Sequence, residues 1–441
     1  MKLLVTGLCT LHWGRLEYGN IGNYYIIEPL FRELHRVFPD AEIMTTFQMT
    51  EPFVEREKVT VLPMDSYYAW KPDDIERAKR EYEIATEYER TGVLRETTPF
   101  IDAVHQAELV IDFSGDMWGD NAEHVGHGRF LVDLYKMGTA QKLGKKTVLF
   151  GGTPGPFTDP ETVGFAKEVF ERFELVVNRE PTSSRNIQEW GFSMEHVRDF
   201  ACPAFLYEPH LTVQQQEEKE RLFRELRAGG RPLVGFTLGG FNLPVGPYDM
   251  WPREDWQYDV FVHAVEHIVN ELGARVVLFS HTNGFELPPS FRLINGRDYP
   301  ILKQLQSIVH SRGKVTSPED VACIDTPHVP ALTKSIVGEF DMVVTGRVHA
   351  SVAAISQEVP TVFMTYEPSF IPSTKMYGFA DLAGVGEFVT EPRDENRLLG
   401  LIDACWNQRA DVHRRLHERI PQVKILAHKA FDALSDLTEK G

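Results

Sequence analysis

One stretch of the chain, residues 341–364, most restricts the fold that this sequence can adopt. Residues 342–344 form an apolar run that predicts a buried strand, and the small residues of 350–355 predict a helix packed closely on a sheet. Residues 361–364 follow Pro360 as a second apolar strand. A strand, helix, strand unit of this kind predicts two parallel strands joined by a right-handed crossover.

Arg347 and His349 lie at the turn where this predicted helix begins. The N-terminus of a helix offers free backbone N–H groups and the positive end of the helix dipole, which both favour an anion. A guanidinium beside a titratable imidazole adds charge-assisted hydrogen bonds and a proton source. The pair therefore indicates a site for a phosphate or a carboxylate. The alternative, a salt bridge for Arg347 and a capping or packing role for His349, stays open from the motif alone.

Similar units recur along the chain and predict a fold of the α/β class. Strands are expected at 3–8, 41–47, 108–113, 146–150 and 175–177, and a second series at 232–238, 275–279, 342–344 and 361–364, with helices between them. This alternation is typical of doubly wound parallel sheets. We therefore expect two Rossmann-like domains that face each other across a cleft, the architecture called GT-B.

The length of 441 residues also favours two domains. The N-terminal Rossmann-like domain is expected at 1–205, with a charged insertion at 51–100 that contains an exposed helix. Residues 206–230 are expected to form a linker and a helix between the domains. The C-terminal Rossmann-like domain, with the Arg-x-His motif, is expected at 231–400, and C-terminal helices that pack on the body at 401–441.

Polar residues directly after predicted strands are candidate ligand-binding groups, because the carboxyl ends of parallel strands meet at one edge of a sheet. Gly115 and Asp116 follow one strand, Arg179 ends another, and His281 follows a third. For Arg179 the alternative is an ion pair with Glu180 or a nearby aspartate. For His281 the alternative is a structural role.

Two further classes of site are disfavoured by spacing. Asp112, Asp116 and Asp120 lack the EF-hand order and have no histidines at ligand spacing, so no metal site is predicted. The first loop contains Asn20 between Gly19 and Gly22, but this is not G-x-G-x-x-G, so a nicotinamide cofactor is not supported. These glycines indicate either a backbone that approaches a ligand or a simple tight turn.

Charge and cysteine spacing restrict the partners and the compartment. The net charge of −18 argues against nucleic-acid binding and against a polybasic membrane patch. Cys9, Cys202, Cys323 and Cys405 are far apart, which indicates buried thiols instead of disulfides or a zinc site. The first apolar run is too short for a signal peptide, and no stretch approaches the ~20 apolar residues that span a bilayer. We expect a cytoplasmic protein without a transmembrane segment; a peripheral association with a membrane stays open.

Several short motifs together resemble the polysaccharide pyruvyl transferase family. The principal one is Gly346-Arg347-Val348-His349-Ala350, followed by a small-residue helix, Val359-Pro360, Tyr366-Glu367-Pro368 and Lys375. Upstream, the resemblance includes Asn20 and Gly22, Gly115-Asp116, Gly155-Pro156, Arg179-Glu180 with Ser183, and His281. The similarity extends over most of the chain and is weakest at 51–100.

This resemblance implies an enzyme that transfers pyruvate from phosphoenolpyruvate onto two hydroxyls of a sugar as a cyclic ketal, in the biosynthesis of surface polysaccharides. It implies a sugar or a lipid-linked glycan as acceptor, with neither a metal nor a redox cofactor. The donor carries a phosphate and a carboxylate, so it requires cations at fixed positions. The expected donor ligands are Arg347, Arg179, Lys375 and His281.

The resemblance also implies acid and base roles. His349 is expected to protonate the methylene carbon of the enol as the general acid, because imidazolium is available near neutral pH. Asp116 is a candidate base for the acceptor hydroxyl, and Asn20, Gly115 and Glu367 are expected in loops near the acceptor.

Two other functions remain open from the sequence. One is a GT-B glycosyltransferase that uses a nucleotide-sugar, in which Glu367 would bind the ribose hydroxyls. The other is a non-catalytic relative that binds an anionic ligand.

Overall fold

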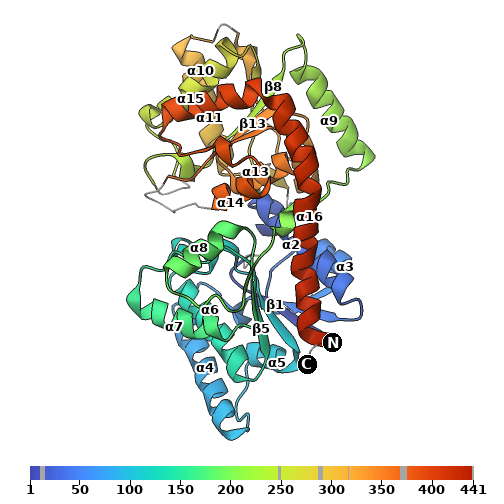
Figure 1. Ribbon diagram of the computed structural model, residues 1–441, viewed down its shortest axis with the longest axis vertical. Coiled ribbons are helices and arrows are strands. Elements are labelled where there is room, and N and C mark those ends of the chain that lie inside the picture. The colour runs from blue at the N-terminus through green and yellow to red at the C-terminus, as the bar shows by residue number, and fades with distance from the viewer. Residues whose placement is uncertain (10–14, 247–249, 287–291, 316, 368–374, 440–441) are drawn as a thin grey trace. The chain divides into compact units, whose positions relative to one another are not determined.

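The structure is a computed structural model that describes residues 1–9, 15–246, 250–286, 292–315, 317–367 and 375–439 (Figure 1). The chain divides into two compact units. Unit 1 consists of Met1–Leu16, Ile27–Pro203 and Leu426–Gly441, and unit 2 consists of Glu17–Ile26 and Ala204–Ile425. Helices α2 (Ile21–Val37) and α16 (Arg409–Glu439) therefore contribute residues to both units.

Unit 1 is built on a seven-stranded parallel sheet with the order β3-β2-β1-β4-β5-β6-β7. Parallel neighbours require crossover connections, and helices supply most of them. The order reverses between β1 and β4, which is where doubly wound sheets bind ligands. The elements are β1 (Lys2–Thr6), α1 (Arg15–Tyr18, shared with unit 2), β2 (Glu42–Thr45), α3 (Glu51–Glu57), β3 (Val59–Val61), α4 (Asp74–Thr91), α5 (Pro99–Gln106), β4 (Leu109–Asp112), α6 (Arg129–Lys142), β5 (Lys146–Gly152), α7 (Pro160–Glu171), β6 (Leu175–Asn178), α8 (Pro181–Glu189) and β7 (Val197–Asp199), with short 3₁₀ turns at Met64–Ser66, Gly115–Met117 and Asp120–Val125.

Unit 2 is built on a six-stranded parallel sheet with the order β12-β9-β8-β13-β14-β15. Counted along the chain, this is the 3-2-1-4-5-6 order of the Rossmann fold, and it reverses between β8 and β13. The elements are α9 (Val213–Leu226), β8 (Leu233–Thr237), α10 (Asp259–Asn270), β9 (Arg275–Leu278), the antiparallel pair β10 (Asn283–Phe285) and β11 (Leu293–Asn295), α11 (Asp298–Arg312), β12 (Val321–Cys323), α12 (Pro330–Val337), β13 (Met342–Thr345), α13 (Val348–Ile355), β14 (Thr361–Met364), α14 (Lys375–Leu382), β15 (Val389–Thr390) and α15 (Glu395–Asn407), with 3₁₀ turns at Pro203–Leu206, Gly240–Asn242, Asp255–Tyr258, Pro318–Asp320 and Gly386–Phe388. The prediction of two doubly wound α/β domains is confirmed.

The segment at 51–100 contributes more to the fold than the sequence indicated. β3 extends the sheet beside β2, and α4 buries Ala78, Ile84 and Ala85 in the core of unit 1. Glu81 of α4 forms an ion pair with Lys136 of α6, and their side chains are only 7% and 3% exposed. The expectation of a solvated helix is therefore wrong for one face of α4. The apolar stripe on that face is narrow and lies among charged residues, so hydrophobic periodicity does not reveal it.

The C-terminal helices follow the prediction more closely. Leu416, Ile420 and Val423 on α16 are buried, whereas Leu426 is only half-buried. Among the described residues, no helix combines the length and the apolar character that a bilayer crossing requires.

Candidate active site

The turn between β13 and α13 lies at the carboxyl end of β13, next to the switch point of the unit 2 sheet. Gly346 donates its N–H to the carbonyl of Thr237, at the end of the neighbouring strand β8. The Thr345 hydroxyl accepts from the Arg347 N–H at 3.0 Å and donates to the Arg347 carbonyl at 3.2 Å. Arg347 is the N-cap residue of α13, and its side chain is buried. The predicted strand, turn, helix, strand unit is thus present, and it fixes the backbone of Arg347.

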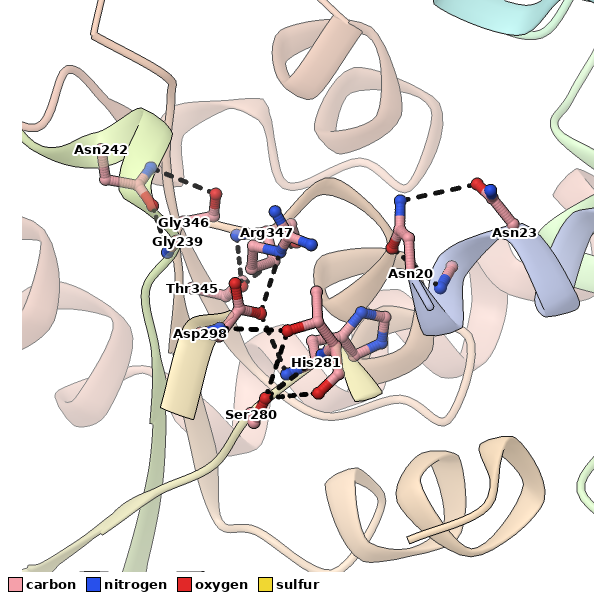
Figure 2. Close-up of polar contacts among 12 residues, drawn as sticks. Asn20, Asn23, Gly239, Asn242, Ser280, His281, Asp298, Thr345, Gly346 and Arg347 are labelled. Carbon is pink, nitrogen blue, oxygen red and sulfur yellow. Dashed lines mark hydrogen bonds and ion pairs between the residues drawn. The ribbon is translucent and has the colours of Figure 1, made fainter. Parts of the chain in front are cut away.

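Asp298 holds the guanidinium of Arg347 (Figure 2). Nε of Arg347 lies 3.3 Å from Oδ2 of Asp298, and both side chains are buried. A Cβ on Gly239 would lie 2.9 Å from Cδ and 3.1 Å from Nη1 of Arg347, so only glycine leaves room for this side chain. Nη2 of Arg347 is buried and has no hydrogen-bond partner among the described residues. The salt bridge considered as an alternative is therefore present, but among the described residues it leaves Nη2 of the guanidinium without a hydrogen bond.

Asn242 ties together the ends of three neighbouring strands, and sequence reasoning missed it. Its amide oxygen accepts from the N–H of Gly239 at 2.9 Å. Its amide nitrogen donates to the carbonyls of Gly346 at 3.1 Å and Thr365 at 3.0 Å. The sequence Gly-Gly-Phe-Asn after a predicted strand is the signal from which it could have been found. Asp298 has no comparable signal, because its role depends on residues that are distant in the chain.

His281 is buried beside Arg347 (Figure 2). The backbone N–H of His281 donates to Oδ2 of Asp298 at 3.2 Å, and the imidazole ring makes an edge contact with Tyr25, with centroids 5.5 Å apart. Burial, with a smaller contribution from the charge of Arg347, lowers the pKa of His281 to about 3. Its imidazole is therefore neutral near pH 7 and can bind a ligand without supplying a proton.

The first loop of the chain belongs to this same group of residues in unit 2. Asn20 forms an antiparallel bridge with Thr282, and the carbonyl of Gly19 accepts from the N–H of Asn283 at 2.9 Å. The Asn20 side chain accepts from the N–H of Gly22 at 3.2 Å. A Cβ on Gly22 would lie 2.5 Å from Cβ and from Nδ1 of His349. The loop thus brings a glycine backbone against the imidazole of the Arg-x-His motif.

Glu367 and Lys375 lie near an aromatic pair at the end of β14. Phe241 and Tyr366 stack with centroids 4.9 Å apart, and Lys375 Nζ lies 5.4 Å from the centroid of the Tyr366 ring. The carboxylate of Glu367 pairs with Arg393 at 2.7 Å. Both Glu367 and Lys375 are buried. This arrangement places a second cation and a carboxylate near the ends of the strands that carry Arg347.

Unit 1 holds a separate group at the carboxyl ends of β4, β5 and β6. Arg179 is buried, and its Nε donates to the Thr153 hydroxyl at 2.7 Å. A Cβ on Gly115 would lie 3.8 Å from Nη1 of Arg179, and Asp116 follows in the same turn. Glu180 accepts from backbone N–H groups at the start of α8, so its carboxylate caps that helix. Gly115, Asp116 and Arg179 therefore share one edge of the unit 1 sheet, and Thr153 is a member that the sequence did not indicate.

The sequence pattern of the polysaccharide pyruvyl transferase family matches residues 20–368. The chain belongs to the polysaccharide pyruvyl transferase family. No curated protein matches the sequence.

Solved structures similar to this pyruvyl transferase family member have the GT-B fold. HepE (Alr3699) from Anabaena, solved with UDP, has a TM-score of 0.59 at 12% identity, covering 100% of both chains. A glycosyltransferase from Rickettsia africae has a TM-score of 0.57 at 10% identity, covering 100% of this chain and 99% of that chain. UDP-GlcNAc 2-epimerase from Neisseria meningitidis, bound to UDP-GlcNAc, has a TM-score of 0.55 at 9% identity, covering 100% of both chains. At these identities the likeness concerns the fold alone, and it confirms the predicted fold class.

The family match includes most of the predicted site residues. Unit 2 contains Asn20, His281, Arg347, His349, Glu367 and Lys375, and unit 1 contains Gly115, Asp116 and Arg179. Of these, Lys375 lies beyond the matched range. Pro368, at the end of the Tyr-Glu-Pro motif, lies outside the described residues. Among those that are described, no three or more His, Cys, Asp or Glu side chains form a group that could hold a metal ion.

Proposed function

We propose that this protein transfers the pyruvyl group of phosphoenolpyruvate onto two hydroxyls of a sugar in surface polysaccharide biosynthesis. Membership of the pyruvyl transferase family supports a transferase of this pathway. The observation that carries the proposal is the buried guanidinium of Arg347, which Asp298 holds by Nε while Nη2 has no hydrogen-bond partner among the described residues. A buried, oriented donor of this kind suits a phosphate or carboxylate oxygen.

Arg347 and Lys375, both in unit 2, are the proposed cations for the donor. The phosphate and the carboxylate of phosphoenolpyruvate together need more than one cation, because Asp298 already neutralises much of the charge of Arg347. Neutral His281, buried next to Arg347, is proposed to donate a hydrogen bond to the donor without adding charge. The site would then hold the donor in one orientation, which supplies much of the rate enhancement.

The proposed reaction begins with a proton transfer from His349 to the methylene carbon of the enol. C2 becomes the centre of an oxocarbenium ion, and the oxygen of the first sugar hydroxyl forms a bond to it while the proton of that hydroxyl passes to a base. The C2–O bond to phosphate then breaks, which leaves a second oxocarbenium ion at C2, and the second hydroxyl closes the cyclic ketal as its proton passes to the departing phosphate. The products are the ketal and inorganic phosphate. An acid positioned in this way contributes about 10²–10⁴ in rate.

The proposal is tested by incubating the purified protein with phosphoenolpyruvate and a panel of glycan acceptors. Acceptor-dependent release of phosphate, together with a pyruvylated product in mass spectrometry, is the expected result. The His349→Gln variant serves as the control, because it should bind the donor without turning it over. Phosphate release that is equal in the presence and absence of every acceptor contradicts the proposal.

A nucleotide-sugar glycosyltransferase is the second candidate. Two of the similar structures were solved with UDP or UDP-GlcNAc bound, and buried Glu367 provides a carboxylate at the end of β14 in this chain. Thermal shift separates the candidates, since a ligand stabilises the folded state that binds it. Protection by UDP-glucose but not by phosphoenolpyruvate would favour the glycosyltransferase. Donor protection without turnover in any assay would favour the non-catalytic anion-binding relative.

A further inference from the structure

The connection between β8 and α10 carries two exposed tryptophans. Trp251 and Trp256 are 53% and 57% exposed, which makes them the two most exposed of the described tryptophans. Single exposed apolar residues need no explanation, but two strongly exposed indoles within six residues of the chain are unusual. Tryptophan is also the residue that contributes most often to the binding energy of an interface. These two side chains therefore suggest a binding surface.

The backbone that carries these tryptophans is held in place by the buried side chain of Arg253 and the half-buried side chain of Gln304. Nε of Arg253 donates to the Met250 carbonyl at 2.8 Å, and its guanidinium also donates to the Val245 carbonyl. Gln304 of α11 accepts from the N–H of Arg253 at 3.0 Å and donates to Asp255 at 3.2 Å. Such fixed backbone presents the indoles with little loss of conformational entropy on binding.

The same connection begins at the candidate site. Gly239 lies against the Arg347 side chain, and Asn242 bonds the backbone of Gly346. Further along, the Pro244 carbonyl accepts from Arg393, which also pairs with Glu367. Trp251 and Trp256 follow Pro244 within 12 residues of the chain, so one connection carries both the contacts to the candidate site and the exposed tryptophans.

The charges on this segment decide which ligand fits it. Glu254 and Asp255, between the two tryptophans, are exposed, whereas Arg253 is buried. A membrane surface carries anionic lipids and favours exposed Lys and Arg, so this segment would be repelled by it. Carboxylates beside aromatic faces suit a neutral ligand that has hydroxyl donors and apolar C–H faces. A neutral oligosaccharide has both features.

We propose that Trp251 and Trp256, with Glu254 and Asp255 between them, form a platform on which the sugar rings of a neutral glycan stack. The proposal deepens the proposed function, and rests on it, in making that glycan the acceptor. Stacking on the two indoles holds the chain of the acceptor, while the reacting sugar occupies the site near Arg347. The platform is thus a determinant of acceptor length and affinity and takes no part in the chemical step.

The experiment measures glycan binding to the full-length protein without the donor. Isothermal titration calorimetry is performed with neutral oligosaccharides of glucose, galactose, mannose and N-acetylglucosamine, and sedimentation with phosphatidylcholine and phosphatidylserine vesicles tests a membrane. The wild type should bind at least one oligosaccharide and neither type of vesicle. Trp251→Ala and Trp256→Ala should each weaken that binding at least about fivefold. Trp190→Ala, which removes a 39% exposed tryptophan of unit 1, should leave it unchanged.

Three results would overturn the platform: no oligosaccharide bound by the wild type, unchanged binding in both variants, or vesicle binding that depends on Trp251. Because the donor is absent from the assay, failure of phosphoenolpyruvate turnover leaves the platform standing. Conversely, turnover of a monosaccharide by a protein that binds no oligosaccharide would overturn the platform and keep the proposed function.

Discussion

Gly22 and His349 lie so close together that no side chain fits at position 22. A Cβ on Gly22 would lie 2.5 Å from both Cβ and Nδ1 of His349, although 327 positions separate the two residues in the chain. Both belong to unit 2, where Asn20 and Thr282 form a bridge that holds the first loop. The contact links the glycine of the first loop to the imidazole of the Arg-x-His motif.

Gly22→Ala should therefore impair turnover by displacing His349. A shift of about 1 Å in a catalytic group can cost on the order of 10² in rate, so a loss of kcat of about that size is expected in the phosphate-release assay. Gly400→Ala is the matched control, because nothing lies within 4 Å of that Cβ in α15. The control should retain full activity and gain up to about 1 kcal/mol in stability. Normal activity of Gly22→Ala would disprove the contact.

Asp298→Asn should leave Arg347 buried without a counter-charge. Loss of one partner of a buried pair is expected to cost about 3–5 kcal/mol in the free energy of unfolding, measured by urea denaturation. Phosphate should then raise the melting temperature of the variant more than that of the wild type, because the anion replaces the missing charge. Asp432→Asn breaks a half-exposed pair with Arg36 and should change stability by less than about 1 kcal/mol. Equal phosphate shifts in Asp298→Asn and wild type would argue against an anion at Arg347.

The two histidines should differ in their contribution to the pH–rate profile. Since burial lowers the pKa of His281 to about 3, this residue does not titrate between pH 5 and 9. His281→Gln should weaken donor binding, seen as a higher KM, and keep the shape of the profile of kcat against pH. His349→Gln should instead reduce kcat by about 10²–10⁴ with little change in donor affinity. If His281→Gln changes the acidic limb of the pH–rate profile, the assignment of the proton transfer to His349 is wrong.

Asp133 should make the stability of the protein depend on pH. Burial raises the pKa of Asp133 to about 6, and burial with the neighbouring Asp133 raises that of Asp112 well above its ordinary value. The folded state therefore binds the proton of Asp133 more tightly than the unfolded state, where the pKa is about 3.9. The resulting stability is present below about pH 4 and is lost as the pH rises through 6, by about 3 kcal/mol in total.

The Asp133→Asn variant lacks this titration, so its stability relative to the wild type should increase as the pH is raised from 4 to 7. Urea unfolding at several pH values in that range measures the difference. If the stability of the two proteins changes with pH in the same way, the pKa of Asp133 is not raised in the folded state.

Much of the fold follows from local pattern. Apolar strands of four or five residues, followed by glycine or polar turns and then by helices, predicted two doubly wound sheets, and the observed strand orders agree. The turn before α13 was also predictable, because a strand, a glycine and a small-residue helix together place Arg347 between the end of a strand and the start of a helix. The buried face of α4 was missed, since its apolar residues are too few to stand out among the charged ones.

The sequence by itself thus determined the fold class, the family and the strand ends at which ligand-binding side chains gather. Only the tertiary structure decided which of them meet: Asp298 with Arg347, Asn242 with Gly346, and Gly22 with His349. It also decided that His281 is neutral. The physical reason is range, because secondary structure depends on neighbours within a few residues, whereas contacts and protonation depend on burial among side chains that are far apart in the chain.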